Sequence, residues 1–117
     1  MILILSGDPV AAALLGALIE TLGYSVRFAQ PPERPEDSIR RVRPKVCLLD
    51  CEDPAHCTDE LLGRATMRGV SVVIFGRSEA LERVREAAKQ HALEVLLMPA
   101  SSEVVDATVR RALRKAG

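Results

Sequence analysis

Short apolar runs recur along the chain and alternate with longer segments in which apolar residues follow helical spacing. Because the runs are continuous rather than alternating with polar residues, they predict parallel strands covered on both faces. Four such strands are expected at Ile2–Leu5, Val46–Leu49, Val70–Phe75 and Val95–Met98. A weaker strand at Ser25–Ala29 places Val26 and Phe28 on one side and Arg27 on the other, which favours a position at the edge of a sheet.

Amphipathic helices are predicted between the strands. The first begins after Asp8, a good N-cap residue, has Pro9 at its first position, and ends before Gly23, which suits a left-handed C-terminal turn. Four more helices are expected at about Glu36–Val42, Thr58–Gly69, Glu79–His91 (with Ser78 as N-cap) and Glu103–Lys115. The apolar stripes expected to be buried include Leu14, Leu15, Leu18, Ile19, Leu22, Met67, Ala80, Val84, Ala88, Val104 and Val105.

Five strands alternating with five helices in 117 residues predict one α/β domain over residues 1–117. The expected architecture is a doubly wound five-stranded parallel sheet with right-handed crossovers and strand order 2-1-3-4-5. In that order the winding reverses between strands 1 and 3, and a crevice opens at their carboxyl ends. The candidate functional residues are therefore Ser6, Gly7 and Asp8 after the first strand and Asp50 after the third.

The composition, 48% hydrophobic and 27% charged, is that of a folded globular domain. Sixteen basic side chains balance sixteen acidic ones, and neither half of the chain has the basic excess that holds a nucleic-acid backbone. The longest wholly apolar stretch, Val10–Leu15, is too short to cross a bilayer, and the first residues lack the basic start of a signal peptide. These features predict a cytoplasmic domain that contacts neither nucleic acid nor membrane.

Three cysteines, Cys47, Cys51 and Cys57, are spaced C-x3-C-x5-C. An odd number argues against a disulfide framework. Although His56 precedes Cys57, the spacing lacks the C-x2-C pairs of structural zinc sites, so no metal is expected there. Cys47 is expected to be a small buried hydrophobic residue.

Four local patterns together resemble the receiver domain of two-component response regulators. They are Ile-Leu-Ile-Leu-Ser-Gly-Asp-Pro at residues 2–9, Leu-Gly-Tyr at 22–24, Val-Cys-Leu-Leu-Asp at 46–50 and Leu-Leu-Met-Pro at 96–99. Each pattern is common alone, but their spacing over essentially the whole chain is similar to that of the family. The resemblance implies a three-layer flavodoxin-like receiver fold, which is consistent with the doubly wound sheet that the periodicity predicts.

The resemblance also implies phosphoryl transfer from a histidine kinase to an Asp at the end of strand 3, which is Asp50 here. In the family, two acidic residues hold a divalent cation, and a Lys neutralises the phosphoryl oxygens. A Ser or Thr bonds the phosphate, an aromatic residue reports it, and a cis proline follows the Lys. Carried over, the acidic pair falls on Ser6 and Gly7, the hydroxyl on Gly76 with Arg77 next, the aromatic on Val95, the Lys on Met98 and the cis proline on Pro99.

Of the phosphorylation chemistry, only the acceptor Asp50 is therefore present. Ser6 and Gly7 offer no carboxylate to Mg²⁺, Met98 offers no cation, and Gly76 offers no hydroxyl. The chain is accordingly expected to be a degenerate receiver, or pseudo-receiver, with a vacant Mg²⁺ site, no cofactor and no enzymatic activity.

Two residues near Asp50 have alternative roles. Asp8 either supplies part of a metal site or caps the first helix, and the following Pro9 favours the cap. Arg77 either pairs with Asp50 as a permanent positive charge or faces solvent. Glu52 and Asp53 add negative charge to the same loop, which disfavours an incoming phosphoryl group.

We expect a protein-interaction module that acts independently of phosphorylation, through the face formed by helix 4, strand 5 and helix 5. The partner is expected to be another protein or a second copy, with a histidine kinase or a fused output domain as candidates. Its expected outward residues are Glu82, Arg83, Glu86, Lys89, Arg110, Arg111 and Arg114. One alternative is a working phospho-acceptor that uses Asp50 in an atypical pocket, and another is a small-ligand module that uses the same crevice.

Overall fold

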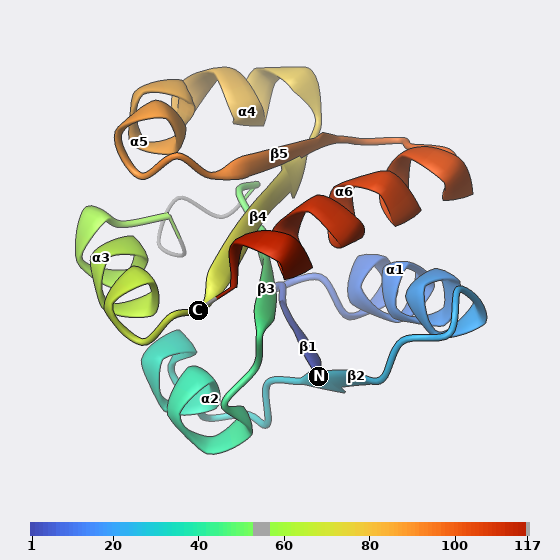
Figure 1. The fold of residues 1–117 in the computed structure, drawn as a ribbon, viewed down its shortest axis with the longest axis horizontal. Helices are drawn as coiled ribbons and strands as arrows, with labels where there is room; N and C mark the ends of the chain where they lie inside the picture. The colour runs from blue at the N-terminus through green and yellow to red at the C-terminus, as the bar shows by residue number, and fades with distance from the viewer. Residues whose placement is uncertain (53–56, 117) are drawn as a thin grey trace.

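The computed structural model describes residues 1–52 and 57–116. Five parallel strands form one sheet in the order β2-β1-β3-β4-β5, which confirms the predicted α/β fold (Figure 1). The strands are β1 (Ile2–Leu5), β2 (Val26–Phe28), β3 (Val46–Asp50), β4 (Ser71–Gly76) and β5 (Glu94–Leu97). The helices are α1 (Pro9–Thr21), α2 (Pro35–Val42), α3 (Asp59–Met67), α4 (Ser78–Arg83), α5 (Arg85–Gln90) and α6 (Ser102–Lys115).

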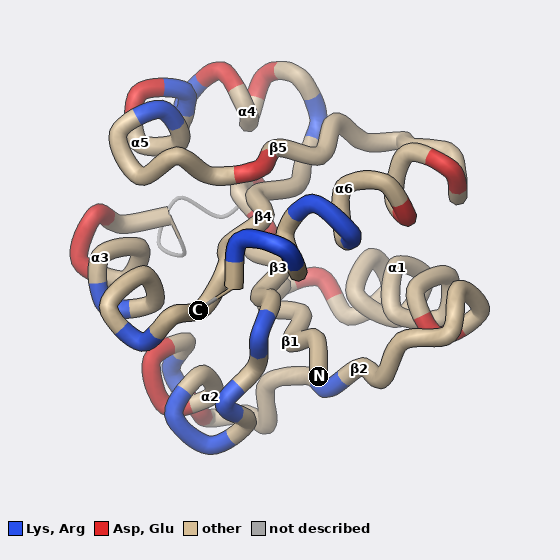
Figure 2. The backbone as a smooth tube through the Cα atoms, in the orientation of Figure 1, with Lys and Arg blue, Asp and Glu red and all other residues tan. Residues whose placement is uncertain are grey.

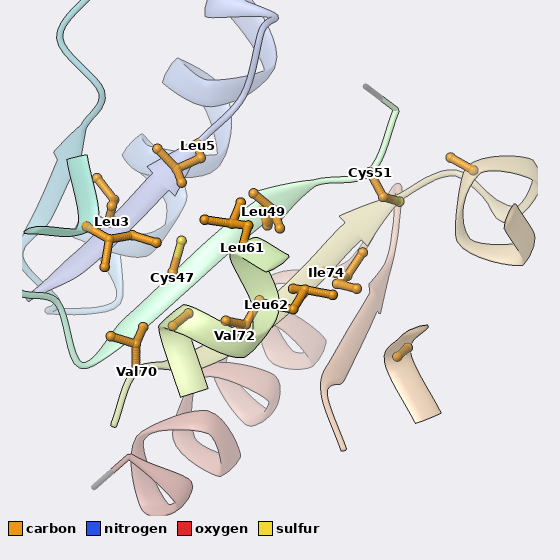
Figure 3. Close-up of a cluster of buried hydrophobic side chains, with 14 residues drawn as sticks. Leu3, Leu5, Cys47, Leu49, Cys51, Leu61, Leu62, Val70, Val72 and Ile74 are labelled. Carbon is orange, nitrogen blue, oxygen red and sulfur yellow. The ribbon is translucent and has the colours of Figure 1, made fainter. Parts of the chain in front are cut away.

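The sheet separates two layers of helices, with α1 and α6 on one side and α2 to α5 on the other (Figure 1). Successive strand residues point to opposite layers, so the continuous apolar runs supply both cores. One core, shared with α2 to α5, contains alternate residues of β1 and β3 such as Leu3 and Cys47 (Figure 3). The other contains the residues between them, such as Ile4 and Leu48, packed against α1 and α6.

Local signals in the sequence correctly placed both ends of α1. The Asp8 carboxylate accepts the backbone N–H groups of Val10 and Ala11 at 3.0 and 3.3 Å, so Asp8 is the N-cap. Gly23 has φ of +99°, the left-handed conformation that glycine adopts without steric cost. Because the β1–α1 loop follows the last residue of β1, it lies at the carboxyl edge of the sheet.

The fourth predicted helix, Glu79–His91, is divided in the structure into α4 and α5 at Val84. The Val84 N–H bonds to Leu81 at 3.2 Å, an i−3 contact, and its φ and ψ of −107° and 11° are not helical. Residues eight apart on a straight helix point about 80° apart. The break allows both Ala80 and Ala88 to be buried against the sheet. The N-cap is Arg77 rather than the predicted Ser78.

Three residues predicted to be buried are exposed instead. Leu14 is 70% exposed and Met67 is 89% exposed, and Val104 also faces outward. In α1 the buried stripe is Ala12, Leu15, Gly16 and Ile19. The helix is apolar on nearly every side, so the sequence did not distinguish this stripe from the adjacent one that contains Leu14. Met67 ends α3, and Val104 lies in the first turn of α6, beside the fully buried Val105.

No helix in the described part of the chain is long and apolar enough to cross a membrane.

Candidate functional site at the carboxyl edge of the sheet

Asp50, the last residue of β3, is only 4% exposed and is held by two neutral donors. The Ser6 hydroxyl donates to Asp50 Oδ2 at 2.6 Å, and the Glu52 backbone N–H donates to Oδ1 at 2.9 Å. Ser6 Oγ also accepts the Asp8 N–H at 3.1 Å. The residue that replaces a family carboxylate is therefore a hydrogen-bond donor that ties the β1–α1 loop to Asp50.

Arg77 bonds to Glu52, so of the two alternatives for Arg77 the pairing with Asp50 is wrong. The Arg77 backbone N–H donates to Glu52 Oε2 at 2.8 Å, its Nε donates to the same oxygen at 3.3 Å, and its Nη2 donates to Oε1 at 3.1 Å. These bonds lower the pKa of Glu52 below its ordinary value and raise that of Arg77. The two residues meet in space although they are far apart in the chain, because β3 and β4 are paired neighbours that end side by side.

Gly76, at the end of β4, has no room for a side chain. A Cβ there would lie 2.7 Å from Cys51 Sγ and 3.4 Å from Glu52 Oε2. Cys51 is buried, and its burial, together with the charges of Asp50 and Glu52, raises the pKa of its thiol to about 11. A thiol and a carboxylate thus fill the space that a serine or threonine at position 76 needs.

The two candidate positions around β5 lack the chemistry of a receiver switch. Met98 packs its thioether against the α1–α6 core, and its backbone N–H donates to the Gly76 carbonyl at 2.8 Å. Val95 is 45% exposed and faces a groove that also contains Leu81 and Val84. The Met98–Pro99 peptide bond is cis, as the resemblance predicted.

The donor set near Asp50 does not fit Mg²⁺. Gly7 has no side chain, the Ser6 hydroxyl is directed at Asp50, and the Asp8 carboxylate caps α1. Mg²⁺ needs near-octahedral oxygen ligands and usually a carboxylate that can turn toward it. Here both Asp50 oxygens and Asp8 Oδ1 already accept hydrogen bonds from the local fold, which leaves too few oxygens free to complete such a shell.

The cysteine cluster has two buried members in the described structure. Cys47 and Cys51 are free thiols in the core shared with α2 to α5 (Figure 3). Cys57 packs against the same core. Burial raises the pKa of the Cys47 thiol to about 12. Among the residues that the structure describes, no three His, Cys, Asp or Glu side chains could together hold a metal. His56 and Asp53 lie outside the described residues.

Several solved structures with this architecture are receiver domains of response regulators. The receiver domain of NtrX from Brucella abortus matches with a TM-score of 0.77 and 17% identity, over 97% of this chain and 98% of that chain. A receiver domain from Clostridium thermocellum matches with a TM-score of 0.77 and 18% identity, over 97% and 94%. The receiver domain of a modulated diguanylate cyclase from Desulfovibrio desulfuricans G20 matches with a TM-score of 0.71 and 23% identity, over 97% and 93%.

The chain spans only 26% of a longer NtrX chain that was solved in complex with ADP. No protein-family model and no curated protein sequence matches the chain. At these identities the likeness concerns the fold, and it establishes that this chain has the fold of response-regulator receiver domains.

The contacts of three residues in the site could not be recognised from the sequence pattern. Ser6 is a candidate because it follows the first strand, but nothing in the pattern predicts that its hydroxyl donates to Asp50. The sequence indicates only a charged loop residue at Glu52. In the structure, its position two residues after Asp50 brings its carboxylate within hydrogen-bonding distance of Arg77, directly after β4. Cys51 carries no signal of its role, because its packing against Gly76 depends on how β3 and β4 end in space.

Proposed function

We propose that this receiver-fold domain is a degenerate receiver: a non-catalytic protein-interaction module whose output does not depend on phosphorylation. The observation that carries the proposal is the Glu52–Arg77 pair beside Asp50. Glu52 Oε2 lies 3.4 Å from where the Cβ of a phosphate-bonding residue at position 76 would be. A carboxylate in that place repels an incoming phosphoryl group and already holds the loop between β4 and α4.

The remaining parts of the site support the same proposal. The developing charge of phosphoryl transfer requires a cation, and Met98 supplies none where a receiver carries its Lys. The donors around Asp50 do not fit Mg²⁺. The working phospho-acceptor is the second candidate, since Asp50 stands at the end of β3 as a phospho-acceptor must.

We expect no propagated response when beryllofluoride, a phosphoryl mimic, and Mg²⁺ are added. Gly76 has no hydroxyl to move, and a conformational equilibrium shifts only by the ligand's differential interaction with the two states. Amide NMR spectra should show no shifts in β5 or α6, and calorimetry should show no Mg²⁺ binding. The variant Ser6→Asp/Gly7→Asp, which returns two carboxylates beside Asp50, is the positive control for Mg²⁺ binding.

Two results together would establish the working phospho-acceptor instead. The wild type would bind Mg²⁺ and Asp50→Asn would not, and the NMR shifts would reach β5 and α6.

The proposed interaction face lies around the edge strand β5. Val95 and Leu97 alternate with the buried Leu96, and they are 45% and 54% exposed. Acidic and basic segments alternate along α4 and α5, and the C-terminal part of α6 is basic (Figure 2). Of the charged residues expected on this face, Arg110 instead pairs with Asp106, whose carboxylate also accepts a hydrogen bond from the Tyr24 hydroxyl. An apolar strip with mixed charges around it suits a contact between two copies.

Self-association through this face predicts that Leu97→Asp abolishes dimerisation. The new carboxylate would be buried without a partner in the contact. Sedimentation velocity at increasing protein concentration measures the effect. Met67→Asp is the matched control, because Met67 is an exposed apolar residue of α3, outside the proposed face, and its replacement should leave the dimer intact. A wild type that stays monomeric throughout the series contradicts self-association.

A further inference from the structure

An apolar groove of about 500 Å³ runs along α1 at the carboxyl edge of the sheet. Ala11, Leu14 and Leu18 of α1 form one wall, and Phe75 and Met98 contribute to its other surfaces. This volume lies within the range of small-molecule sites, which are mostly apolar with a few polar groups at fixed positions.

The wall on α1 contains exposed apolar side chains that do not take part in covering the sheet. Leu14 is 70% exposed and Val10, one turn earlier, is also exposed, whereas the sheet is covered by Leu15 and Ile19. Contiguous exposed apolar surface beside a hollow is typical of a binding site. Met98 extends this surface with a polarizable, adaptable thioether.

One end of the groove is negatively charged. This end is lined by three acidic residues, Asp8, Asp50 and Glu52. Among the described residues that line the groove, Arg77 is the one basic side chain. Arg77 is already paired with Glu52. Asp8 and Asp50 have no ion pair in the described structure, and the bonds to their carboxylates come from neutral donors. Asp50 is a nearly buried carboxyl group that borders a cavity, and buried charges in proteins are ordinarily paired.

We propose that this groove binds a small amphipathic cation, an amine on an apolar chain or ring. The ammonium group lies at the end formed by Asp8 and Asp50, and the apolar body lies along Leu14, Leu18 and Met98. The ligand supplies the countercharge that the site lacks, and its body covers the exposed wall of α1. This inference goes beyond the proposed function, because it concerns a small ligand in the α1 groove rather than a protein on the β5 face.

Three probes separate the contributions of charge and apolar body. Octylamine has both, octanoate has the same chain with the opposite charge, and putrescine has charge without an apolar end. Calorimetry should show saturable binding of octylamine. The affinity for octanoate should be at least about tenfold lower, because attraction to the carboxylates becomes repulsion. Putrescine should not bind measurably. In NMR spectra, octylamine should shift the Met98 methyl group and the amides of α1.

Two variants test the location without unfolding the domain. Leu14→Ser removes an exposed wall residue. Met67→Ser, the control, removes an even more exposed apolar side chain that does not line the groove. Asp8→Asn removes a charge and keeps an N-cap of equal quality. Leu14→Ser and Asp8→Asn should each weaken octylamine binding severalfold, and Met67→Ser should leave it unchanged.

Equal binding of octanoate and octylamine would overturn the proposal, as would octylamine binding that Leu14→Ser leaves unchanged. If octylamine does not bind and Leu14→Ser instead alters sedimentation, the groove is covered by a second copy of the chain and the proposal fails. A failure of these tests leaves the phosphorylation-independent function untouched, since that function is tested by beryllofluoride.

Discussion

Replacing Gly76 with threonine, which returns the receiver hydroxyl, is expected to destabilise the domain by about 3 kcal/mol. The new Cβ would lie 2.7 Å from Cys51 Sγ, and the Cys51 side chain is buried. The substitution would also crowd the Glu52 carboxylate, 3.4 Å from the same Cβ, and weaken its bonds to Arg77. Urea unfolding measures the loss, and the resonances of Arg77 should shift with it.

The clash with Cys51 is tested by a double-mutant cycle. In a Cys51→Ala background the sulfur is absent, so Gly76→Thr should cost at least about 1 kcal/mol less than in the wild type. Gly63→Ala is the control for glycine replacement, because a Cβ at this position in α3 meets nothing within 4 Å. Gly63→Ala should stabilise the helix by up to about 1 kcal/mol. Equal losses from Gly76→Thr in both backgrounds would show that Cys51 does not close the site.

Ionisation of the Cys47 thiol is expected to lower the free energy of unfolding by about 4 kcal/mol as the pH approaches 12. A pKa difference of one between the folded and unfolded states corresponds to about 1.4 kcal/mol. Burial raises the pKa of this thiol from 9.0 to about 12, so the folded state favours the protonated form. A group whose pKa is raised on folding contributes stability that is complete below the unfolded pKa and is lost as the pH rises toward the folded one. Urea unfolding over this pH range measures the decline.

Other groups also titrate in alkali, so the difference between variants isolates Cys47. Cys47→Ala should begin less stable, because it leaves a small cavity, and its stability should fall less steeply above pH 9. Cys51→Ala provides a second comparison, since the pKa of Cys51 is raised to about 11. Parallel curves for Cys47→Ala and the wild type would contradict the prediction.

The strand order and the crevice were predictable because they follow from local signals. Continuous apolar runs require a sheet covered on both faces, and right-handed crossovers leave few ways to connect five such strands. Asp50 and Ser6 were placed at the same edge by that reasoning alone. The cap at Asp8 was also predictable, since it depends on residues within three positions of it.

Burial within the helices was harder to predict. Nearly every side of α1 is apolar, so its sequence is compatible with more than one buried stripe, and packing against β1 and β2 selected the one with Leu15 and Ile19. Leu14 was left on the surface, where it forms the wall of the groove. The break at Val84 likewise depends on how Ala80 and Ala88 both reach the sheet.

Residue types and their spacing along the chain were enough to define the class of fold and the edge of the sheet at which chemistry can occur. They also show that positions 6, 7, 76 and 98 carry Ser, Gly, Gly and Met rather than an acidic pair, a hydroxyl and a Lys. Packing in three dimensions selected which of the remaining groups meet. Arg77 bonds to Glu52 rather than Asp50, Ser6 donates to Asp50, and Cys51 fills the space above Gly76. These contacts join residues from different strands and loops. Hydrogen bonds and steric exclusion depend on differences of a few tenths of an ångström to a few ångströms, and the spacing of residues along the chain does not determine positions that finely.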